Sequence, residues 1–480
     1  MKTKREPRIR SVKFNVLMNM IVVTSSFLFP LITVPYVSRV LSPKGMGAVS
    51  WAQSILNYFS IVALLGIPSY GIRECAKVRN DNEKLSQTVQ ELLTILLIST
   101  SVVYAAFLAA VFFIPRMRQD APTMFIFSIG IWLSACGVEW FYQAIEQYAY
   151  ITVRNVAMKL VSLILMFLLI HSVSDYRIYA IILVIGSYGS NIINVLRLHK
   201  FVTFKKRKLN LRRHFKPMVS FAISKISSGL YAQMDIVLVG FMCTNTAVGL
   251  YQLVVKIKNL SVVAVNSVSD VMLPRLSYYK SNADETKLAD LMAKNLNFLM
   301  ILGLFLLSII SVCSKPLILV IAGSQYVEAT KALIVVSPVI LFSALNSLLS
   351  QFLIVQGREK VYAIINFLGL VSSIITGLLL IPRFNIIGAA LSITLSESIT
   401  LIIRIIATRR LLLNLNGKFD FLKIIGAFAL SLAALFIIRP IVQQQLNIVQ
   451  IVIYTLVYLC IDLFSLLLMK ENFITTTLKR

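Results

Sequence analysis

Long apolar segments recur along this chain from about residue 14 almost to its end, and short polar loops separate them. A helix needs roughly 20 apolar residues to cross a bilayer, because lipid offers the backbone no hydrogen-bond partners. The pattern predicts an all-α polytopic membrane protein with about fourteen transmembrane helices. A composition that is 58% hydrophobic and 14% charged excludes an ordinary soluble domain. The predicted spans lie near residues 14–37, 48–70, 88–114, 122–144, 156–172, 178–198, 217–240, 247–273, 291–313, 329–351, 361–381, 387–408, 422–439 and 449–469.

The formal net charge of +27 is distributed in the way that membrane topology requires. Lys and Arg crowd both ends of the chain and three loops, near residues 73–84, 200–216 and 409–423, whereas the intervening loops hold few. Basic residues accumulate in cytoplasmic loops, so we expect both termini in the cytoplasm, in agreement with an even number of spans. Because the charge follows the membrane in this way, it does not indicate a nucleic-acid partner.

The most basic segment, HKFVTFKKRKLNLRRHFK at residues 199–216, could be a nucleic-acid or calmodulin-binding patch. It lies midway between two groups of apolar segments, however. This position favours a cytoplasmic linker that fixes topology and contacts anionic lipid head groups.

The residue types that carry catalysis or bind metals are scattered. The five cysteines have no CxxC spacing, and the three histidines stand singly, so neither disulfides nor a metal site are expected. The chain has no GxxxxGK[ST] run, which excludes an ATP-driven pump of the P-loop kind. The predicted extracytoplasmic loops are too short to hold a catalytic site, so we expect no catalytic residues and no enzymatic activity.

Two of the predicted helices carry polar stripes within their apolar length. The polar residues recur at intervals of three, four or seven, which places each set along one face of a helix. The first set comprises Ser224, Ser228, Tyr231 and Asp235, with Lys225 beside it. The second comprises Gln252, Lys256, Asn259, Asn266 and Asp270. We expect the two stripes to face a shared wet space.

The chain also contains a weak internal repeat. EQYAYITVRNVAMKLVSLILMFLLI, from residue 146, aligns with REKVYAIINFLGLVSSIITGLLLIP, from residue 358, when Gln147 is placed opposite Arg358. Asn155 then matches Asn366 at an offset of 211 (366 minus 155). This offset is the size of a six-helix lobe and predicts two parallel lobes related by a pseudo-two-fold axis along the membrane normal. We therefore expect an N-terminal lobe and linker at 1–210, a C-terminal lobe at 211–410, and two additional helices and a tail at 411–480.

Several motifs together resemble the Wzx-type polysaccharide-unit flippases of the multidrug/oligosaccharidyl-lipid/polysaccharide (MOP) exporter superfamily, and the resemblance covers nearly the whole chain. It implies a MATE-like fold and a bacterial inner-membrane location. The motifs are LSPKGMGAVSWAQSI (41–55), GIPSYGIRECAKVR (66–79), VEWFYQAIEQYAYITVRN (138–155), QMDIVLVGFMCTNTAVGLYQLVVKI (233–257), VMLPRLS (271–277) and IPRFNIIGAALSITLSE (381–397).

The resemblance implies an undecaprenyl-diphosphate-linked oligosaccharide as the substrate, moved from the cytoplasmic to the outer leaflet by alternating access. A polysaccharide polymerase and a ligase are then candidate partners. The physics agrees, because unpaired polar groups cost several kcal/mol each in hydrocarbon, whereas the prenyl tail can stay in lipid.

By polar striping and by similarity to the superfamily, the first, second, seventh and eighth helices are expected to line the transport path. Pro30 and Pro35 should bend the first. Lys225 and Lys256 suit the diphosphate. Amides and hydroxyls suited to sugars are Asn19, Gln53, Asn57, Tyr231, Gln252 and Asn259. Secondary head-group contacts are expected from Arg39, Arg73 and Arg275.

Acidic residues within the apolar segments are candidates for coupling transport to a proton or sodium gradient, since no other cofactor is expected. Asp235 is the first candidate, and Glu139 and Glu397 are the next. A structural pairing of Asp235 with Lys225 or with Lys256 is the alternative.

Three other functions remain open from the sequence. A peptidoglycan-precursor (lipid II) flippase and a cation-coupled small-molecule or drug exporter would share the architecture. An exporter of cationic drugs should have a transport path rich in acidic residues, whereas the path expected here contains Lys225 and Lys256. A membrane-embedded glycan enzyme would have to show hydrolysis or transfer when purified.

Overall fold

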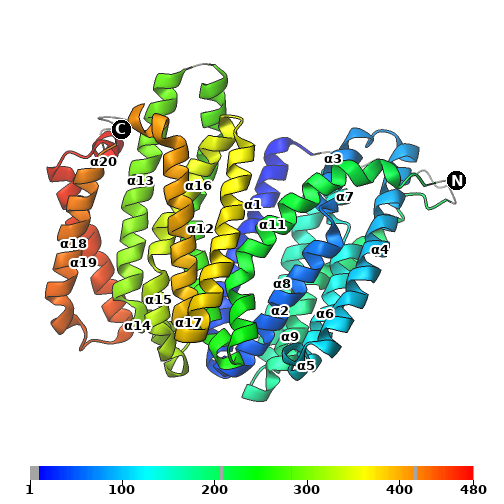
Figure 1. Cartoon of the computed structure of the whole chain (residues 1–480), viewed down its shortest axis with the longest axis horizontal. Coiled ribbons are helices and arrows are strands. Elements are labelled where there is room, and N and C mark those ends of the chain that lie inside the picture. Colours follow the sequence, from blue (N-terminus) through cyan, green and yellow to red (C-terminus); the bar gives the residue numbers. More distant parts are fainter. Residues whose placement is uncertain (1–9, 206–208, 283, 415–418, 479–480) are drawn as a thin grey trace. The chain divides into compact units, whose positions relative to one another are not determined.

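The computed structural model describes residues 10–205, 209–282, 284–414 and 419–478, and all regular secondary structure within these ranges is helical (Figure 1). Twelve helices in this part of the chain are long and apolar enough to span a membrane. The polytopic all-α class expected from the sequence is therefore confirmed. The chain forms two compact units, Met1–Gln233 (unit 1) and Met234–Arg480 (unit 2), which divide within one long helix.

Unit 1 contains the first ten α-helices and most of the eleventh. Its elements are α1 (Val12–Val40), α2 (Pro43–Leu64), α3 (Ile67–Lys77), α4 (Asn82–Phe113), α5 (Pro115–Gln119), α6 (Ala121–Cys136), α7 (Glu139–Ala144), α8 (Tyr148–Leu169), η1 (Val173–Asp175), α9 (Tyr176–Val184), η2 (Ile185–Gly189), α10 (Ser190–Leu198) and α11 (Arg212–Met242). Pro30 and Pro35 both lie inside α1, as expected.

Unit 2 contains the remaining helices. They are α12 (Asn245–Ser281), α13 (Glu285–Val312), α14 (Ser314–Ile321), η3 (Ser324–Ala329), α15 (Thr330–Val336), α16 (Pro338–Val355), α17 (Glu359–Asn414), α18 (Phe421–Val442), α19 (Asn447–Leu468) and α20 (Asn472–Leu478). Within this unit, α12 and α13 extend together beyond their neighbours (Figure 1).

Short polar side chains fix where several helices begin. Each accepts hydrogen bonds from backbone N–H groups of the first turn, which otherwise have no partner. At α4, Asp81 accepts from the N–H groups of Glu83 and Lys84. Hydrogen bonds from the backbone and side chain of Lys84 lower the pKa of Asp81. The same capping role is filled by Ser42 at α2, Thr244 at α12 and Asp284 at α13.

Every predicted span overlaps one or more described helices over most of its length, although the count differs. The twelve candidate spans do not include α11, and they treat the 51 residues Glu359–Arg409 of α17 as one span. The fifth predicted span, interrupted by Lys159, is the helix α8. There the Lys159 ammonium donates to the hydroxyls of Ser25 (2.9 Å) and Ser26 (2.7 Å) on α1, and these hydrogen bonds replace part of its hydration within the apolar run.

The helix α17 is a hairpin rather than one rod. Asn385 has non-helical backbone angles (φ 53°, ψ −130°). The Thr376 and Ser392 hydroxyls are 2.8 Å apart, although sixteen residues of straight helix would separate them by about 24 Å. At the turn, a Cβ on Gly388 would lie 2.2 Å from the carbonyl oxygen of Leu380, so the close approach of the two arms requires glycine.

A comparable pairing of helices occurs in unit 1. There α8 lies against η2 and α10, and Ser190 donates to the Asn155 side chain (3.3 Å). In unit 2 the aligned Asn366 accepts a hydrogen bond from Arg404 of the second arm of α17 (2.5 Å). Both α8 and α17 begin seven residues before the aligned asparagine. These matches support the repeat, whereas the boundaries of the six-helix lobes stay a prediction.

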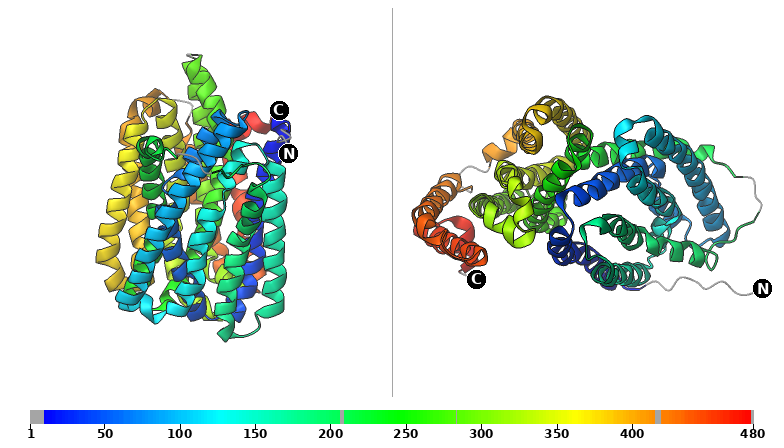
Figure 2. Two further views of the ribbon diagram at one scale, coloured as in Figure 1. Left: turned by 90° about the vertical axis from the view of Figure 1, so that its right-hand side faces the viewer. Right: turned by 90° about the horizontal axis from the view of Figure 1, so that it is seen from below.

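The last two long helices pack within unit 2. Figure 2 shows α18 and α19 side by side, and their residues Leu435, Tyr454 and Tyr458 share an apolar core with Ile309 and Cys313. In unit 1 an apolar core joins α3, α4 and α7 with the beginning of the linker after α10. This core therefore anchors the linker that leads into α11.

Candidate functional site

The second helix and α11 are joined by polar contacts in unit 1. The Asn57 amide of α2 donates to the Gln233 side chain of α11 (3.2 Å), and the Tyr188 hydroxyl donates to Asn57 (3.4 Å). The Tyr58 hydroxyl donates to the carbonyl of Leu230 (2.6 Å). Striping predicted Asn57 as a path residue, but it did not identify Gln233 or Tyr188, because contacts between helices leave no local pattern.

A glycine lets α11 approach the end of α2. Gly66 has φ +72°, and a Cβ there would lie 2.6 Å from the backbone nitrogen of Ala222. Only glycine satisfies both the left-handed angle and this backbone contact. The stretch of α11 that carries Lys225 is therefore held close to the corner between α2 and α3.

The predicted path residues of unit 1 differ in accessibility. Asn19 of α1 and Lys225 of α11 are exposed, whereas Gln53 and Tyr231 are half-buried. Asn15, one turn before Asn19, is buried and donates to Glu146 (3.4 Å). The side chains of Ser224, Ser228 and Asp270 lie outside the described residues.

In unit 2, one face of α12 carries the predicted polar stripe. Gln252 and Lys256 are half-buried and Asn259 is exposed, whereas Tyr251 and Val254, on another face, are buried. Lys256 makes no hydrogen bond or ion pair with any residue that the structure describes. A cation between two amides on an accessible helix face can bind an anion without first breaking an internal ion pair.

A second lysine of α12 was not anticipated. Lys258 follows Lys256 by two residues, so its side chain leaves the helix on another face, and it is only 9% exposed. Helical periodicity did not predict a role for Lys258, because it lies outside the polar stripe.

Asp235 is held by a tyrosine rather than by a lysine. One carboxylate oxygen accepts the hydroxyl of Tyr251 (2.9 Å), and the other accepts the backbone N–H of Ile236 (2.9 Å). Lys225 precedes Asp235 by ten residues (235 minus 225) on the continuous helix α11, about 15 Å along its axis. That separation is too long for the direct pairing considered from the sequence. Lys256 also forms no ion pair with Asp235.

The two other candidate carboxylates also have partners. Glu139 accepts from the Arg154 guanidinium (2.5 Å) and from the Gln143 amide (3.4 Å). Glu397 accepts from the Asn346 amide (2.7 Å). A carboxylate in an ion pair is the weaker candidate for binding a transported cation, because the guanidinium already compensates its charge.

The basic residues expected near head groups are accessible. Arg39, at the end of α1, and Arg275, in the extended part of α12, are exposed. Arg73 lies over the rings of Tyr70 (5.5 Å) and Phe221 (5.0 Å) and pairs with Glu74 (3.1 Å). It therefore also helps to attach the start of α11 to α3.

The linker is attached by a buried carboxylate that sequence analysis missed. Glu91 of α4 is fully buried and accepts from the backbone of Asn210 (2.9 Å), from Arg213 (2.5 Å) and from His214 (2.8 Å). The other ring nitrogen of His214 lies 2.8 Å from the Tyr70 hydroxyl. The segment predicted as a simple topological linker is thus also a docked part of unit 1.

Comparisons with known proteins agree with this architecture. Residues 12–280, more than half of the chain, match the family described as polysaccharide biosynthesis protein. The putative O-antigen transporter of Shigella dysenteriae is 22% identical over 393 residues, 80% of this chain and 97% of that protein. The capsular polysaccharide biosynthesis protein CapF of Staphylococcus aureus is 25% identical over 276 residues, 54% of this chain and 67% of that protein.

Two solved structures show the fold. The lipid II flippase MurJ, in an inward closed conformation, has a TM-score of 0.69 at 16% identity, covering 94% of this chain and 99% of that one. An inward-facing multidrug resistance MATE family transporter of the MOP superfamily has a TM-score of 0.65 at 12% identity, covering 84% and 98%. The chain has the MOP superfamily fold and belongs to the polysaccharide biosynthesis protein family.

Proposed function

We propose that this protein is a flippase that moves a lipid-linked oligosaccharide repeat unit from the cytoplasmic to the outer leaflet by alternating access. The names of its relatives, an O-antigen transporter and a capsular polysaccharide biosynthesis protein, support a glycan precursor as the substrate. The observation that carries the proposal is the accessible face of α12, on which Lys256 stands between two amide side chains. No chemical step on the substrate is required, so we propose a transporter and not an enzyme.

The chemistry of this face fits an undecaprenyl diphosphate head. Lys256 supplies a cation for the diphosphate, and Gln252 and Asn259 supply donors and acceptors for sugar hydroxyls. Lys225 is the corresponding cation on α11. The prenyl tail needs no protein cover, because lipid already solvates it.

Electrostatics favours the outward direction. The diphosphate carries about two negative charges, and each is worth roughly 2.3 kcal/mol per 100 mV of inside-negative potential. Outward movement therefore gains up to about 4–5 kcal/mol per 100 mV if the protein's own charges stay in place. Return of the empty carrier leaves Lys256 without the negative charge of the diphosphate, and this step needs another counter-charge.

We propose Asp235 as the group that couples this return to a proton or sodium gradient. Its carboxylate is buried and has no cationic partner among the residues that the structure describes; Tyr251 and a backbone N–H donate to it instead. Glu139, in an ion pair with Arg154, is less suited to exchange a cation. Glu397, bound by Asn346, is the second candidate.

The cellular setting follows from the same proposal. The protein would lie in the bacterial inner membrane with both termini in the cytoplasm, where repeat units are assembled. The oligosaccharide would then pass to a polymerase or ligase at the outer leaflet. We also retain the division into lobes at residues 1–210 and 211–410, with two further helices from 411.

A reconstituted assay tests the function. Purified protein in proteoliposomes should move a fluorescent undecaprenyl-diphosphate oligosaccharide to the opposite leaflet, where an impermeant glycan-modifying reagent reaches it. Lipid II and a cationic dye test the two alternatives, and the shared fold of MurJ makes lipid II the more important of them. Faster movement of lipid II or of the dye, with no movement of the oligosaccharide, would overturn the proposal.

A further inference from the structure

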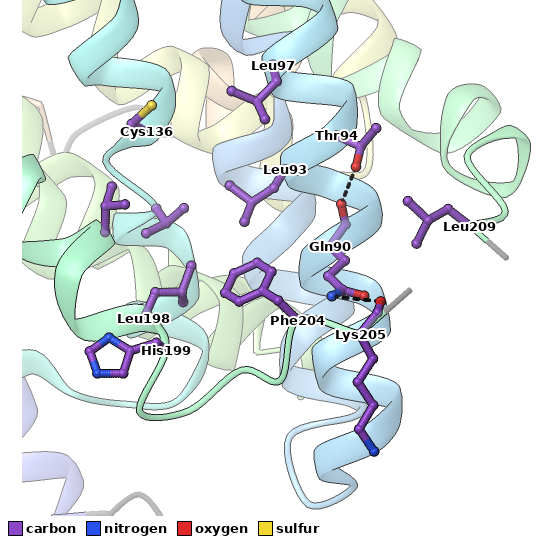
Figure 3. A pocket seen from close by; sticks show the side chains of 12 residues that line it. Gln90, Leu93, Thr94, Leu97, Cys136, Leu198, His199, Phe204, Lys205 and Leu209 are labelled. Atoms are coloured by element: carbon purple, nitrogen blue, oxygen red, sulfur yellow. Dashed lines mark hydrogen bonds between the residues drawn. The ribbon is translucent and has the colours of Figure 1, made fainter. Parts of the chain in front are cut away.

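A pocket of about 620 Å³ lies between α4, the end of α10 and the linker of unit 1 (Figure 3). Leu93 and Leu97 line it from α4, and Leu198 and Phe204 line it from the other side. His199 and Lys205 lie at its opposite end from Leu97 and Cys136 in this view. The volume is within the roughly 300–1,000 Å³ range of small-molecule sites.

The pocket is built by specific contacts of the linker. The Gln90 amide donates to the carbonyls of Thr203 (3.2 Å) and Lys205 (3.4 Å), and the Thr203 N–H donates to Ser86 (3.0 Å). Glu91 holds the linker again at Asn210. The linker is thus attached to α4 at Thr203 and Lys205 and again at Asn210, and the pocket lies between the linker and α4.

The lining changes character along α4. Leu97 is 47% exposed and lies seven residues beyond Gln90, about 10 Å deeper along the helix. Phe204 is 56% exposed although it is strongly apolar. The basic residues His199 and Lys205, both exposed, are contributed by the linker side. A ligand that fits must be apolar along one part and anionic at the other.

We propose that this pocket binds an anionic glycerophospholipid of the cytoplasmic leaflet. One acyl chain would pack along Leu93 and Leu97, and the phosphate would lie at Lys205 and His199. Basic pockets between transmembrane helices on the cytoplasmic side are a known way to bind acidic lipid head groups. The basic side chains suit the phosphate and the apolar lining suits the adjoining part of an acyl chain, whereas a soluble anion lacks the apolar part and a neutral lipid lacks the net charge.

A pocket of unit 2 shares two lining positions with the first pocket by the internal repeat. Its volume is about 610 Å³, and its lining includes Ile406 and Arg409, which follow Val195 and Leu198 of the first pocket by 211 residues (406 minus 195 and 409 minus 198). Arg358 also lines it and donates to the carbonyl of Ala407 (2.9 Å). Arg358 and Arg409 make this pocket basic as well, but in the repeat they match Gln147 and Leu198 (358 minus 211 and 409 minus 211), and not His199 or Lys205 of the first pocket.

Native mass spectrometry of the purified full-length protein tests the proposal with two probes, dioleoyl-phosphatidylglycerol and dioleoyl-phosphatidylcholine. The protein should retain the anionic lipid preferentially. Lys205→Gln should weaken its binding by about fivefold, the effect expected for one basic residue at an anionic surface. Lys200→Gln is the matched control, because Lys200 is an exposed lysine of the same segment outside the pocket lining, and it should retain wild-type binding.

Cys136 gives a second readout, because it lines the apolar part of the pocket and is half-buried. Phosphatidylglycerol should slow its modification by a lipid-soluble maleimide in the wild type, and Lys205→Gln should reduce this protection. Equal binding by wild type and Lys205→Gln, or an equal loss with Lys200→Gln, would overturn the proposal. Displacement of phosphatidylglycerol by equimolar undecaprenyl phosphate would also contradict it, because the pocket would then be a substrate site. None of these measurements requires transport activity.

Discussion

The hydroxyl of Tyr251 donates a 2.9 Å hydrogen bond to the buried carboxylate of Asp235, which links the end of α11 to α12 within unit 2. A buried carboxylate usually has a cationic partner, because desolvation of an unpaired charge is costly. Here a neutral donor takes that place. Exchange of a proton or a cation at Asp235, as proposed above, would therefore not require an ion pair to be broken.

Asp235→Asn should separate substrate binding from energy coupling. The amide keeps the size of the side chain and its hydrogen bond with Tyr251, but it can neither release a proton nor bind a cation. We expect the variant to bind the lipid-linked oligosaccharide in detergent as the wild type does. Its turnover should be at least tenfold slower, which corresponds to a rise of about 1.4 kcal/mol in the activation barrier. It should show no response to an imposed ion gradient. A binding assay on the detergent-solubilised protein measures the first, and proteoliposome transport measures the turnover and the response to the gradient.

Tyr251→Phe is the control for Asp235→Asn, since it removes the hydrogen bond but retains the carboxylate. It should lower stability by about 1–3 kcal/mol and preserve the response to the gradient. Gradient-sensitive transport at the wild-type rate by Asp235→Asn would reject the coupling role.

Lys256→Ala and Lys225→Ala should each abolish export while the protein stays in the membrane. Both residues are accessible cations of the proposed path, and the diphosphate would lose a charge-assisted contact with either change. Complementation of a flippase-null strain, with immunoblots of the membrane fraction, provides the measurement. Lys315→Ala, which removes an exposed lysine at the start of α14, should complement fully. Full complementation by both path variants would place the diphosphate site elsewhere.

The topology prediction depends on the distribution of basic residues. Reporter fusions at the amino terminus, after Lys200 and at the carboxyl terminus should all report a cytoplasmic location. Fusions near Lys44 and Arg177 should report the opposite side, because their loops carry few basic residues. An external location for any of the first three would contradict the fourteen-helix interpretation.

Local periodicity explains what the sequence could predict. The accessible face of Gln252, Lys256 and Asn259 follows from spacings of four and three residues on one helix, and such spacing is visible without knowledge of any neighbour. The break near Pro382 likewise separated two predicted spans, 361–381 and 387–408, which form the two arms of the α17 hairpin. Both features are properties of a single segment.

Contacts between helices could not be predicted in this way. Reasoning from charge alone offered a lysine partner for Asp235 as the alternative to a coupling role, whereas the structure brings the hydroxyl of Tyr251 to it. Glu91 and Arg213 meet across 122 residues (213 minus 91), and neither lies in a recognisable motif. These partners depend on how two helices are rotated relative to each other. The periodicity of either sequence segment alone carries no information about that rotation.

Gly388→Ala should prevent normal formation of the α17 hairpin. The added Cβ would lie 2.2 Å from the Leu380 carbonyl oxygen, and a backbone atom cannot move aside as the end of a flexible side chain can. We expect destabilisation of at least about 3 kcal/mol, the upper end for overpacking. Fluorescence-detected size-exclusion chromatography should show little monodisperse protein.

Gly426→Ala is the control for the hairpin variant. Its Cβ would approach only the mobile end of Met469, at 3.3 Å, so the yield of monodisperse protein should remain close to that of wild type. A normal profile for Gly388→Ala would show that the two arms can separate without loss of the fold.

Glu91→Gln should release the linker from unit 1. Its carboxylate joins α4 to Asn210, Arg213 and His214, and a glutamine has only one acceptor oxygen to replace both. The side chain of Arg213 is 44% exposed, so water compensates part of the loss. We therefore expect about 2–3 kcal/mol of destabilisation, below the range for a wholly buried pair. Differential scanning fluorimetry in detergent measures this change.

Limited trypsin digestion distinguishes release of the linker from general unfolding. Cleavage within residues 199–216 should accelerate in Glu91→Gln at temperatures well below its unfolding midpoint, because proteolysis follows the local opening of a segment. Glu83→Gln, at an exposed position on the same helix, should be cleaved as slowly as wild type. If Glu91→Gln unfolds at a lower temperature but its linker is no more sensitive to trypsin, the carboxylate stabilises the core around α4 without docking the linker.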